Sequence, residues 1–231
     1  MIPANKIIVA LDVDDRTKLT MLLKHLEGQG VWVKFGMEIF YSLGADVLTE
    51  ARDRGLKVFL DLKLHDIPNT VEHALRALVK LPVDMLNVHA AGGSEMLKRS
   101  ADVLKSKAQP PLLIAVTQLT STSQDQMNLE QGIQGEVVDS VLRYAKLSRD
   151  SGLDGVVCSP LEISRVKEVC GKNFLTITPG IRPAGALKDD QKRVTTPKEA
   201  LDLGTDYMVI GRPITQAFNP REALKAILKG S

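Results

Sequence analysis

The fold of this chain is decided by residues 57–70, which read KVFLDLKLHDIPNT. The first half has the apolar pattern of a β-strand, and the second half is charged and polar. Because side chains alternate between the two faces of a strand, Asp61 and Lys63 are predicted to point the same way as Phe59. A carboxylate and an ammonium group are therefore expected side by side at the end of an apolar strand.

A helix is predicted to begin directly after this strand. Pro68 suits the first position of a helix, where its missing N–H is not needed. Asn69 and Glu72 have the spacing of a capping box, which also marks a helix start. Asp66 is then expected in the turn between the strand and the helix.

Two interpretations of these charged residues are open. In the first, Asp61, Lys63 and Asp66 form a structural ion pair, while Asn69 and Thr70 cap the helix. Burying charges costs several kcal/mol per ion, and ordinary packing rarely offsets that cost. We therefore favour the second interpretation, in which the charged residues form a functional site.

Strand-like and helix-like patterns alternate along the whole chain. Apolar residues at helical spacing are clearest over Thr17–Glu27 and Val71–Leu81. Such alternation predicts βαβ units and a parallel sheet, and eight strands close a TIM barrel. The predicted strands are Ile7–Leu11, Val31–Phe35, Val58–Leu62, Met85–His89, Leu112–Val116, Gly155–Cys158, Phe174–Thr178 and Tyr207–Ile210. We predict an α/β fold, a single-domain TIM (β/α)8 barrel over residues 1–231, because barrels commonly have this length.

Composition argues against several classes of protein. The 30 basic and 28 acidic residues are balanced and aromatic residues make up only 4%, so a nucleic-acid-binding surface is not expected. The sequence has no long apolar run that predicts a membrane span or a signal peptide, and we expect a cytoplasmic protein. Cys158 and Cys170 lack C-x-x-C spacing, so neither zinc binding nor redox chemistry is predicted.

Polar residues follow most of the predicted strands. The active site of a TIM barrel lies at the carboxyl ends of its strands, so these residues are expected on one rim. Taken singly, Asp12 is equally compatible with a helix cap and Lys34 with a solvated strand end, and His89 is more typical of a structural histidine. The rim residues are Asp12, Lys34, Gly36, Asp61, Lys63, Asn87, His89, Thr117–Ser121, Gly180, Arg182, Gly211 and Arg212.

A phosphate site is predicted after the last two strands. Gly180 and Arg182 follow the seventh strand, and Gly211 and Arg212 follow the eighth, which is the usual location of a phosphate site in a barrel. Glycine lets backbone N–H groups approach phosphate oxygens, and a guanidinium offers a planar fork to a dianion. Two segments without periodicity are predicted to be functional loops, residues 118–128 and 179–197.

The string Asp61-x-Lys63-x-x-Asp66-Ile67-Pro68-Asn69-Thr70 resembles the signature of the orotidine 5'-monophosphate (OMP) decarboxylase family. The similarity extends from Asp12 to Arg212. It implies a stand-alone enzyme of the bacterial type, a carboxy-lyase that converts OMP to UMP and CO2 in pyrimidine biosynthesis without a metal or other cofactor. Further segments similar to family motifs are Leu119–Ser121, Pro179–Pro183, Asp190–Arg193 and Ile210–Ile214.

The resemblance also implies roles for individual residues. Lys63 would be the proton donor, Asp61 would lie beside the substrate carboxylate, and Lys34 and Asp66 would complete an alternating network of charges. In this family the residues matching Asp66, Ile67 and Thr70 reach the site of the neighbouring subunit, which implies a homodimer with shared active sites. The remaining substrate contacts implied are Asp12 and Lys34 at the ribose, Thr120 and Ser121 at the pyrimidine, Gln191, Gly211 and Arg212 at the phosphate, and Arg182 supporting a lid over residues 179–196.

Two other functions compete with this one. A sister barrel, such as a hexulose-phosphate synthase-like aldolase or a sugar-acid phosphate decarboxylase, shares the D-x-K-x-x-D core but works on a metal-stabilised enediolate. Ile67–Thr70 and Leu119–Ser121 argue against that alternative. A barrel that only binds a phosphorylated ligand is the other possibility, but it has no need of Lys63 between two carboxylates.

Overall fold

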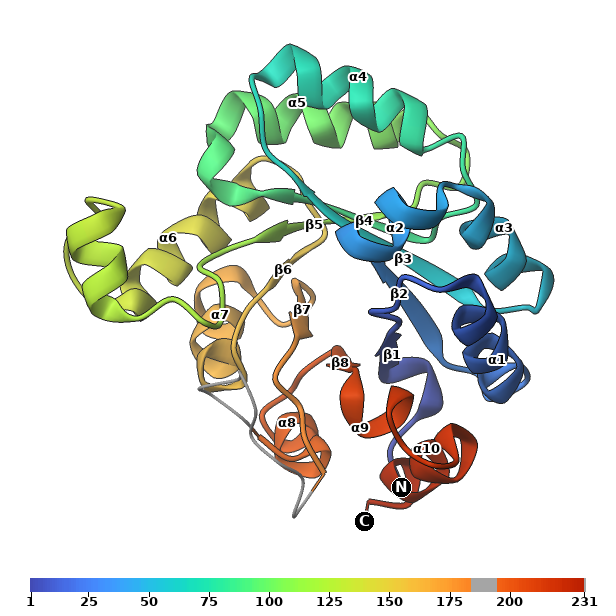
Figure 1. Cartoon of the computed structure of the whole chain (residues 1–231). Coiled ribbons are helices and arrows are strands. Elements are labelled where there is room, and N and C mark those ends of the chain that lie inside the picture. The colour runs from blue at the N-terminus through green and yellow to red at the C-terminus, as the bar shows by residue number, and fades with distance from the viewer. Residues whose placement is uncertain (184–194, 231) are drawn as a thin grey trace.

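Eight parallel strands form one closed barrel in sequence order, and helices cover its outer surface (Figure 1). The computed structural model describes residues 1–183 and 195–230. The strands are β1 (Ile7–Ala10), β2 (Trp32–Gly36), β3 (Lys57–Leu64), β4 (Met85–His89), β5 (Leu112–Val116), β6 (Gly155–Val157), β7 (Leu175–Thr178) and β8 (Tyr207–Ile210). All eight predicted strands and the predicted TIM-barrel fold are confirmed.

Helices follow the strands along the chain, as the alternating pattern predicts. They are α1 (Arg16–Leu26), α2 (Met37–Leu43), α3 (Asp46–Asp53), α4 (Pro68–Leu78), α5 (Gly93–Lys105), α6 (Val137–Asp150), α7 (Ile163–Cys170), α8 (Pro197–Asp202), α9 (Arg212–Thr215) and α10 (Pro220–Lys229). Short helical turns also occur, namely η1 (Ala4–Lys6), η2 (Ala90–Gly92), η3 (Gln126–Glu130) and η4 (Pro160–Glu162). The predicted loop over residues 118–128 therefore ends inside a turn of π-helix, η3.

Helix α1 shows how the sequence builds an outer helix. The Asp15 carboxylate caps its amino end by accepting a hydrogen bond from the Lys18 backbone N–H at 2.7 Å. Asp12 is thus not the cap of this helix, and its carboxylate is directed to another partner. The buried side of α1 carries Leu19, Leu22, Leu23 and Leu26.

Helix α4 begins at Pro68, as predicted, but the predicted capping box is wrong. Because Pro68 occupies the first helical position, the capping position falls on Ile67, whose side chain has no acceptor. Asn69 lies inside the first turn, where its amide nitrogen is 3.4 Å from Nδ1 of His73. The Glu72 carboxylate pairs with an arginine one turn later instead of with the helix start.

The apolar core has two layers separated by the sheet. Phe59 lies in the inner layer, whereas Leu60 and Leu62 lie in the outer layer between the sheet and the helices. The alternation predicted for this strand is therefore confirmed over these residues. The inner layer consists of Ile8, Ala10, Trp32, Phe59, Met85, Ile114, Ile177 and Val209.

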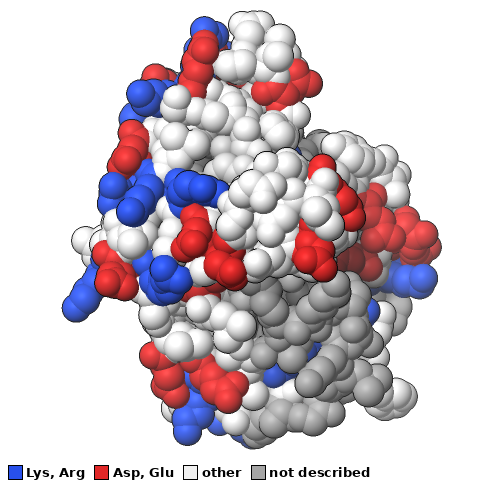
Figure 2. Space-filling model, turned by 90° about the vertical axis from the view of Figure 1, so that its left-hand side faces the viewer, with Lys and Arg blue, Asp and Glu red and all other residues white. Residues whose placement is uncertain are grey.

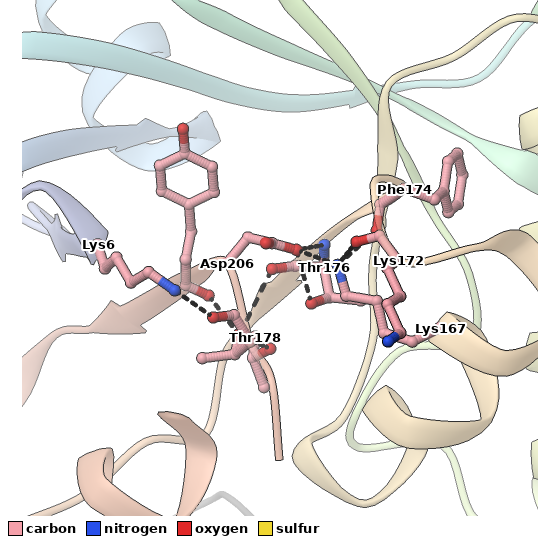
Figure 3. A network of polar contacts seen from close by, with 9 residues as sticks. Lys6, Lys167, Lys172, Phe174, Thr176, Thr178 and Asp206 are labelled. Atoms are coloured by element: carbon pink, nitrogen blue, oxygen red, sulfur yellow. Dashed lines mark hydrogen bonds and ion pairs between the residues drawn. The ribbon is translucent and has the colours of Figure 1, made fainter. Parts of the chain in front are cut away.

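Three aspartates form a repeated structure at the amino-terminal end of the barrel. Asp84, Asp154 and Asp206 each precede the first residue of an even-numbered strand, and each carboxylate accepts a hydrogen bond from the second backbone N–H of the preceding strand. Figure 3 shows the third case, in which Asp206 binds the Thr176 N–H at 2.8 Å and pairs with the Lys167 ammonium. Polar groups at this end of a barrel serve stability, since the active site lies at the opposite end.

The charge distribution on the surface and the state of the cysteines are as expected from the composition of the chain. Basic and acidic side chains are interspersed on the face that carries η3 and α6, shown in Figure 2. Cys158 and Cys170 are buried free thiols. In the part of the chain that the structure describes, no helix is long and apolar enough to span a membrane.

Candidate active site

A cavity of about 400 Å³ opens at the carboxyl ends of the strands. This volume lies within the range of small-molecule sites. Its base is formed by side chains of the inner core layer, among them Phe59, Ile177 and Val209. The polar residues at its rim are Asp12, Lys34, Asp61, Lys63, Gln118, Thr120, Ser121, Arg182 and Arg212. The expectation that residues from distant segments meet at one rim is thus confirmed for these residues. It is wrong for four others expected there, which do not line the cavity, namely Gly36, Asn87, His89 and Thr117.

A row of alternating charges runs along one wall of this cavity. The Lys34 ammonium lies 3.3 Å from Oδ1 of Asp12 and 3.2 Å from Oδ2 of Asp61. The Lys63 ammonium lies 2.7 Å from Oδ1 of Asp61. The Asp61 side chain is only 10% exposed, whereas Asp12 at one end of the row is 59% exposed. The carboxylate at the centre is therefore removed from water and neutralised by two cations.

The charges in this row stabilise one another. Burial opposes the charged form of Lys34, but attraction by Asp61 and Asp12 is stronger in sum and raises the pKa of the lysine. Burial likewise opposes ionisation of Asp61, yet the nearby Lys34 and Lys63 keep the pKa of the carboxyl below its usual value. At neutral pH both groups are charged, and the row can present a cation and an anion to a ligand.

The backbone of β3 departs from regular strand geometry where the row is built. Pairing between β3 and β4 shifts register between Leu60 and Leu64. Within that shift Lys63 has a φ of 51°, and it is the only non-glycine residue in the described ranges with a positive φ. An irregularity of this kind re-aims side chains and is typical of sites next to active centres.

The predicted phosphate residues also meet at the cavity. Gly180, Arg182, Gly211 and Arg212 all line it, and Arg182 is 8% exposed. The backbone N–H of Arg182 donates to the Thr195 carbonyl at 3.0 Å, so Arg182 lies at the base of the predicted lid. Gln191, the other predicted phosphate contact, lies outside the described residues.

The segment after β5 supplies further polar groups. Thr120 and Ser121 line the cavity, as predicted, together with Gln118 and Leu119. Gln118 is buried and its amide donates to Oγ of Ser140 at 3.1 Å. Its position two residues after the end of an apolar strand is the signal that included Gln118 among the predicted rim residues.

Three predicted site residues lie outside this cavity. Asp66, Ile67 and Thr70 follow the β3 bulge and are not among the cavity residues of their own chain. The Asp66 carboxylate accepts a hydrogen bond from the Ile67 N–H at 2.7 Å, and Ile67 is 66% exposed. These residues are therefore accessible to another molecule.

His89 has the environment of a structural histidine, which is the role that its sequence context favoured. Its Nδ1 accepts a hydrogen bond from the Ala91 N–H at 3.3 Å, and its ring stacks on His65 with 5.3 Å between centroids. Burial lowers the pKa of His89, with smaller contributions from His65 and Lys63. The ring is thus held neutral near pH 7.

The acidic groups of the site are separated by cations. Within residues 1–183 and 195–230, no three His, Cys, Asp or Glu side chains gather in an arrangement that could hold a metal ion. The cations and carboxylates of the charge row can hold a charged organic ligand by ion pairs and hydrogen bonds.

The fold and the site together define a (β/α)8-barrel enzyme in which a cavity joins a row of alternating charges to two glycine–arginine pairs. The sequence profile of the Orotidine 5'-phosphate decarboxylase / HUMPS family matches residues 5–227. The chain belongs to this family.

Relatives with the first of these names are similar over nearly the whole chain. The chain is 52% identical to orotidine 5'-phosphate decarboxylase of Bacillus cereus (strain G9842) over 228 residues, which cover 97% of this chain and 96% of the relative. The corresponding protein of Bacillus mycoides (strain KBAB4) is 51% identical with the same coverage.

Solved structures have the same fold. The crystal structure of orotidine 5'-phosphate decarboxylase from Lactobacillus acidophilus superposes with a TM-score of 0.87 at 44% identity and 98% coverage of both chains. An uncharacterized conserved protein from Geobacillus kaustophilus superposes with a TM-score of 0.85 at 39% identity, covering 96% of this chain and 99% of that one.

Proposed function

We propose that this chain is an orotidine 5'-monophosphate decarboxylase, which releases CO2 from C6 of OMP and forms UMP. The observation that carries the proposal is the ammonium group of Lys63, held 2.7 Å from a buried carboxylate at the wall of the cavity. Membership of the family and the names of relatives about half identical to this chain support the substrate. On this proposal residues 1–231 form a single catalytic domain.

The difficulty of the reaction lies in the electron pair left on C6 when CO2 departs. This pair occupies an sp2 orbital that the pyrimidine ring delocalises poorly. An ammonium group about 4 Å away contributes about 4 kcal/mol at an effective dielectric constant near 20, or about a thousandfold in rate. Lys63 Nζ then transfers a proton to C6, and the neutral amine regains a proton from water.

The rest of the rate enhancement is assigned to substrate contacts far from C6. Asp12 and Lys34 hold the ribose hydroxyls, and Thr120 and Ser121 contact the pyrimidine. Gln191, Gly211 and Arg212 bind the phosphate, and Arg182 supports the lid at its base. Binding energy from these remote groups holds the substrate against the charge row in the transition state.

A homodimer with shared active sites is part of this proposal. The Asp66 carboxylate, with Ile67 and Thr70, lies outside the cavity of its own chain. The 66% exposure of an isoleucine at that position is consistent with a surface that a second subunit covers.

A cytoplasmic location fits the free thiols of Cys158 and Cys170.

The test follows the ultraviolet absorbance of OMP with purified protein in EDTA. We expect conversion to UMP by the wild type and none by Lys63→Ala. Lys57→Ala is the matched control on the same strand, because the Lys57 ammonium lies over the Trp32 ring at the other end of the barrel, 5.1 Å from the centroid. It should retain activity.

The same experiment addresses the sister barrels, since the family also includes the HUMPS proteins. A wild type that is inert with OMP but active on a hexulose phosphate after addition of Mg²⁺ would overturn the proposal. Inactivity toward both substrates would favour a barrel that only binds its ligand.

A further inference from the structure

Asn87 lies behind the charge row, on the strand next to β3. The described residues that line the cavity include none from β4, so Asn87 does not face the substrate. It is 2% exposed, yet its side chain bonds to both neighbours in the row. Nδ2 donates to Oδ1 of Asp61 at 2.6 Å, and Oδ1 accepts from the Lys63 backbone N–H at 2.8 Å.

We propose that Asn87 is a positioning residue for the decarboxylation, which fixes Asp61 and Lys63 relative to each other without touching the substrate. This inference rests on the proposed function for its kinetic part. Its structural part, the dependence of the β3 bulge on one amide, stands on the contacts alone.

The register of the barrel explains why an amide is required at this position. Leu60 pairs with Leu86 and Leu64 pairs with Val88, so Asn87 alone faces the three residues 61–63 of β3. Regular backbone pairing does not continue across such a shift. A primary amide offers a donor and an acceptor, as a peptide group does, and so replaces the missing ladder contacts.

The conformation of Lys63 gives the second reason. A φ of 51° is unfavourable for a residue with a Cβ atom and persists only where the surroundings enforce it. The hydrogen bond from the Lys63 N–H to Asn87 is a direct contact that holds this conformation. Because the backbone turn aims the side chain, the amide indirectly sets the direction of the Lys63 ammonium.

Asn87 is also one of the three side chains that bind the Asp61 carboxylate. Oδ1 of Asp61 accepts from both the Lys63 ammonium and the Asn87 amide, while Oδ2 faces the Lys34 ammonium. The two contacts of Asn87 are consistent with one orientation of the amide only, because a backbone N–H donates and an ionised carboxylate accepts. The orientation of the carboxylate plane is thereby determined from behind the cavity.

The decisive variant is Asn87→Asp, which keeps the acceptor for the Lys63 N–H but loses the donor to Asp61. Hydrogen bonds to functional groups from an outer shell, measured for metal ligands, are worth about 10- to 100-fold in activity. We expect kcat to fall by about this factor with KM for OMP little changed, since ribose and phosphate contacts remain. Initial rates measured over a range of OMP concentrations give kcat and KM separately.

The pH profile of Asn87→Asp provides a readout that a merely structural role would not move. The charged groups facing this position are Asp61 and Lys63 from β3 and, beyond Asp61, Lys34 from β2, while its partner on β5 is the apolar Ile114. The introduced carboxyl lies beside the Asp61 carboxylate, so it favours its protonated form. Protonation restores a donor, and kcat relative to wild type should rise as the pH is lowered from about 7 to about 5.

Thermal unfolding gives a readout independent of activity. A carboxyl whose pKa is raised in the folded state stabilises the fold at low pH and loses that contribution as the pH rises. The Tm of Asn87→Asp should therefore approach that of wild type at low pH. This result would stand even if the wild type failed to decarboxylate OMP, in which case only the kinetic part would be lost.

Ser100→Ala is the control for loss of a buried polar group far from the cavity. Ser100 is buried on α5 and donates to the Met96 carbonyl at 2.7 Å, so its removal should lower stability without changing kcat. If Asn87→Asp does not fold, Asn87→Ser replaces it, with the same expected fall in kcat. A folded variant with kcat within about twofold of wild type, or with only KM raised, would overturn the proposal.

Discussion

Replacing Asp61 by asparagine removes the negative charge between Lys34 and Lys63 while keeping the shape of the side chain. In the native chain the carboxylate lies 3.2 Å from one ammonium and 2.7 Å from the other, and it is 10% exposed. In the variant the two cations would face each other across a neutral amide. Both the stability of the fold and the direction of the Lys63 side chain depend on this charge.

The size of the effect follows from burial and from the partners that remain. Removing one member of a buried ion pair usually costs about 3–5 kcal/mol, because the other charge stays buried. Lys34 keeps a second partner, Asp12, at 3.3 Å, so we expect the lower end, about 3 kcal/mol. For a chain of this length that loss corresponds to a fall in Tm of about 6–12 °C.

The assay is thermal unfolding followed by circular dichroism, paired with kcat/KM for OMP on the same preparations. Asp206→Asn is the matched control, since Asp206 also pairs with a lysine and binds a strand N–H, but at the amino-terminal end of the barrel. Both variants should unfold at lower temperature. Only Asp61→Asn should lose activity, by about 100-fold, as expected for a misplaced reacting group.

A Tm of Asp61→Asn equal to or above that of wild type would refute this reasoning. It would mean that the cost of burying the carboxylate exceeds the attraction of its two lysines. Equal losses of kcat/KM in Asp61→Asn and Asp206→Asn would refute the assignment of the charge row to catalysis, because both would then act only through stability.

Three further predictions concern other parts of the chain. Arg212→Ala should lower kcat/KM by several orders of magnitude and should also lower kcat, because binding energy from the remote phosphate acts in the transition state. An unchanged kcat in steady-state kinetics would contradict this prediction. Gly155→Ala should lower the unfolding free energy by about 3 kcal/mol, since an added Cβ would lie 2.3 Å from the Leu175 carbonyl oxygen; urea denaturation with an unchanged midpoint would exclude it. The pKa of His89 is lowered by burial and then by His65 and Lys63, so the unfolded chain binds this proton more readily and stability should fall as the pH drops from about 7 to about 5. His89→Gln should flatten that dependence in urea titrations at each pH, and an identical slope would argue against it.

The sequence by itself determined the architecture and brought most of the predicted rim residues of the described chain to one cavity. Apolar runs separated by helical patterns are a local signal, so the eight strands of the barrel could be predicted from them. Because the carboxyl ends of parallel strands meet at one rim, the distant residues Asp12, Lys34, Asp61, Lys63 and Arg212 could be placed in one cavity.

The tertiary structure alone decided how those residues are held. The amide of Asn87 and the positive φ of Lys63 depend on the register between β3 and β4, which is a pairing of two strands and leaves no mark in either one alone. The capping box at Asn69 failed for a different, local reason, because Pro68 takes the first position of α4 and the cap therefore falls on Ile67. Local patterns report which way a side chain faces, whereas its partners are set by the neighbouring strand that folding brings beside it.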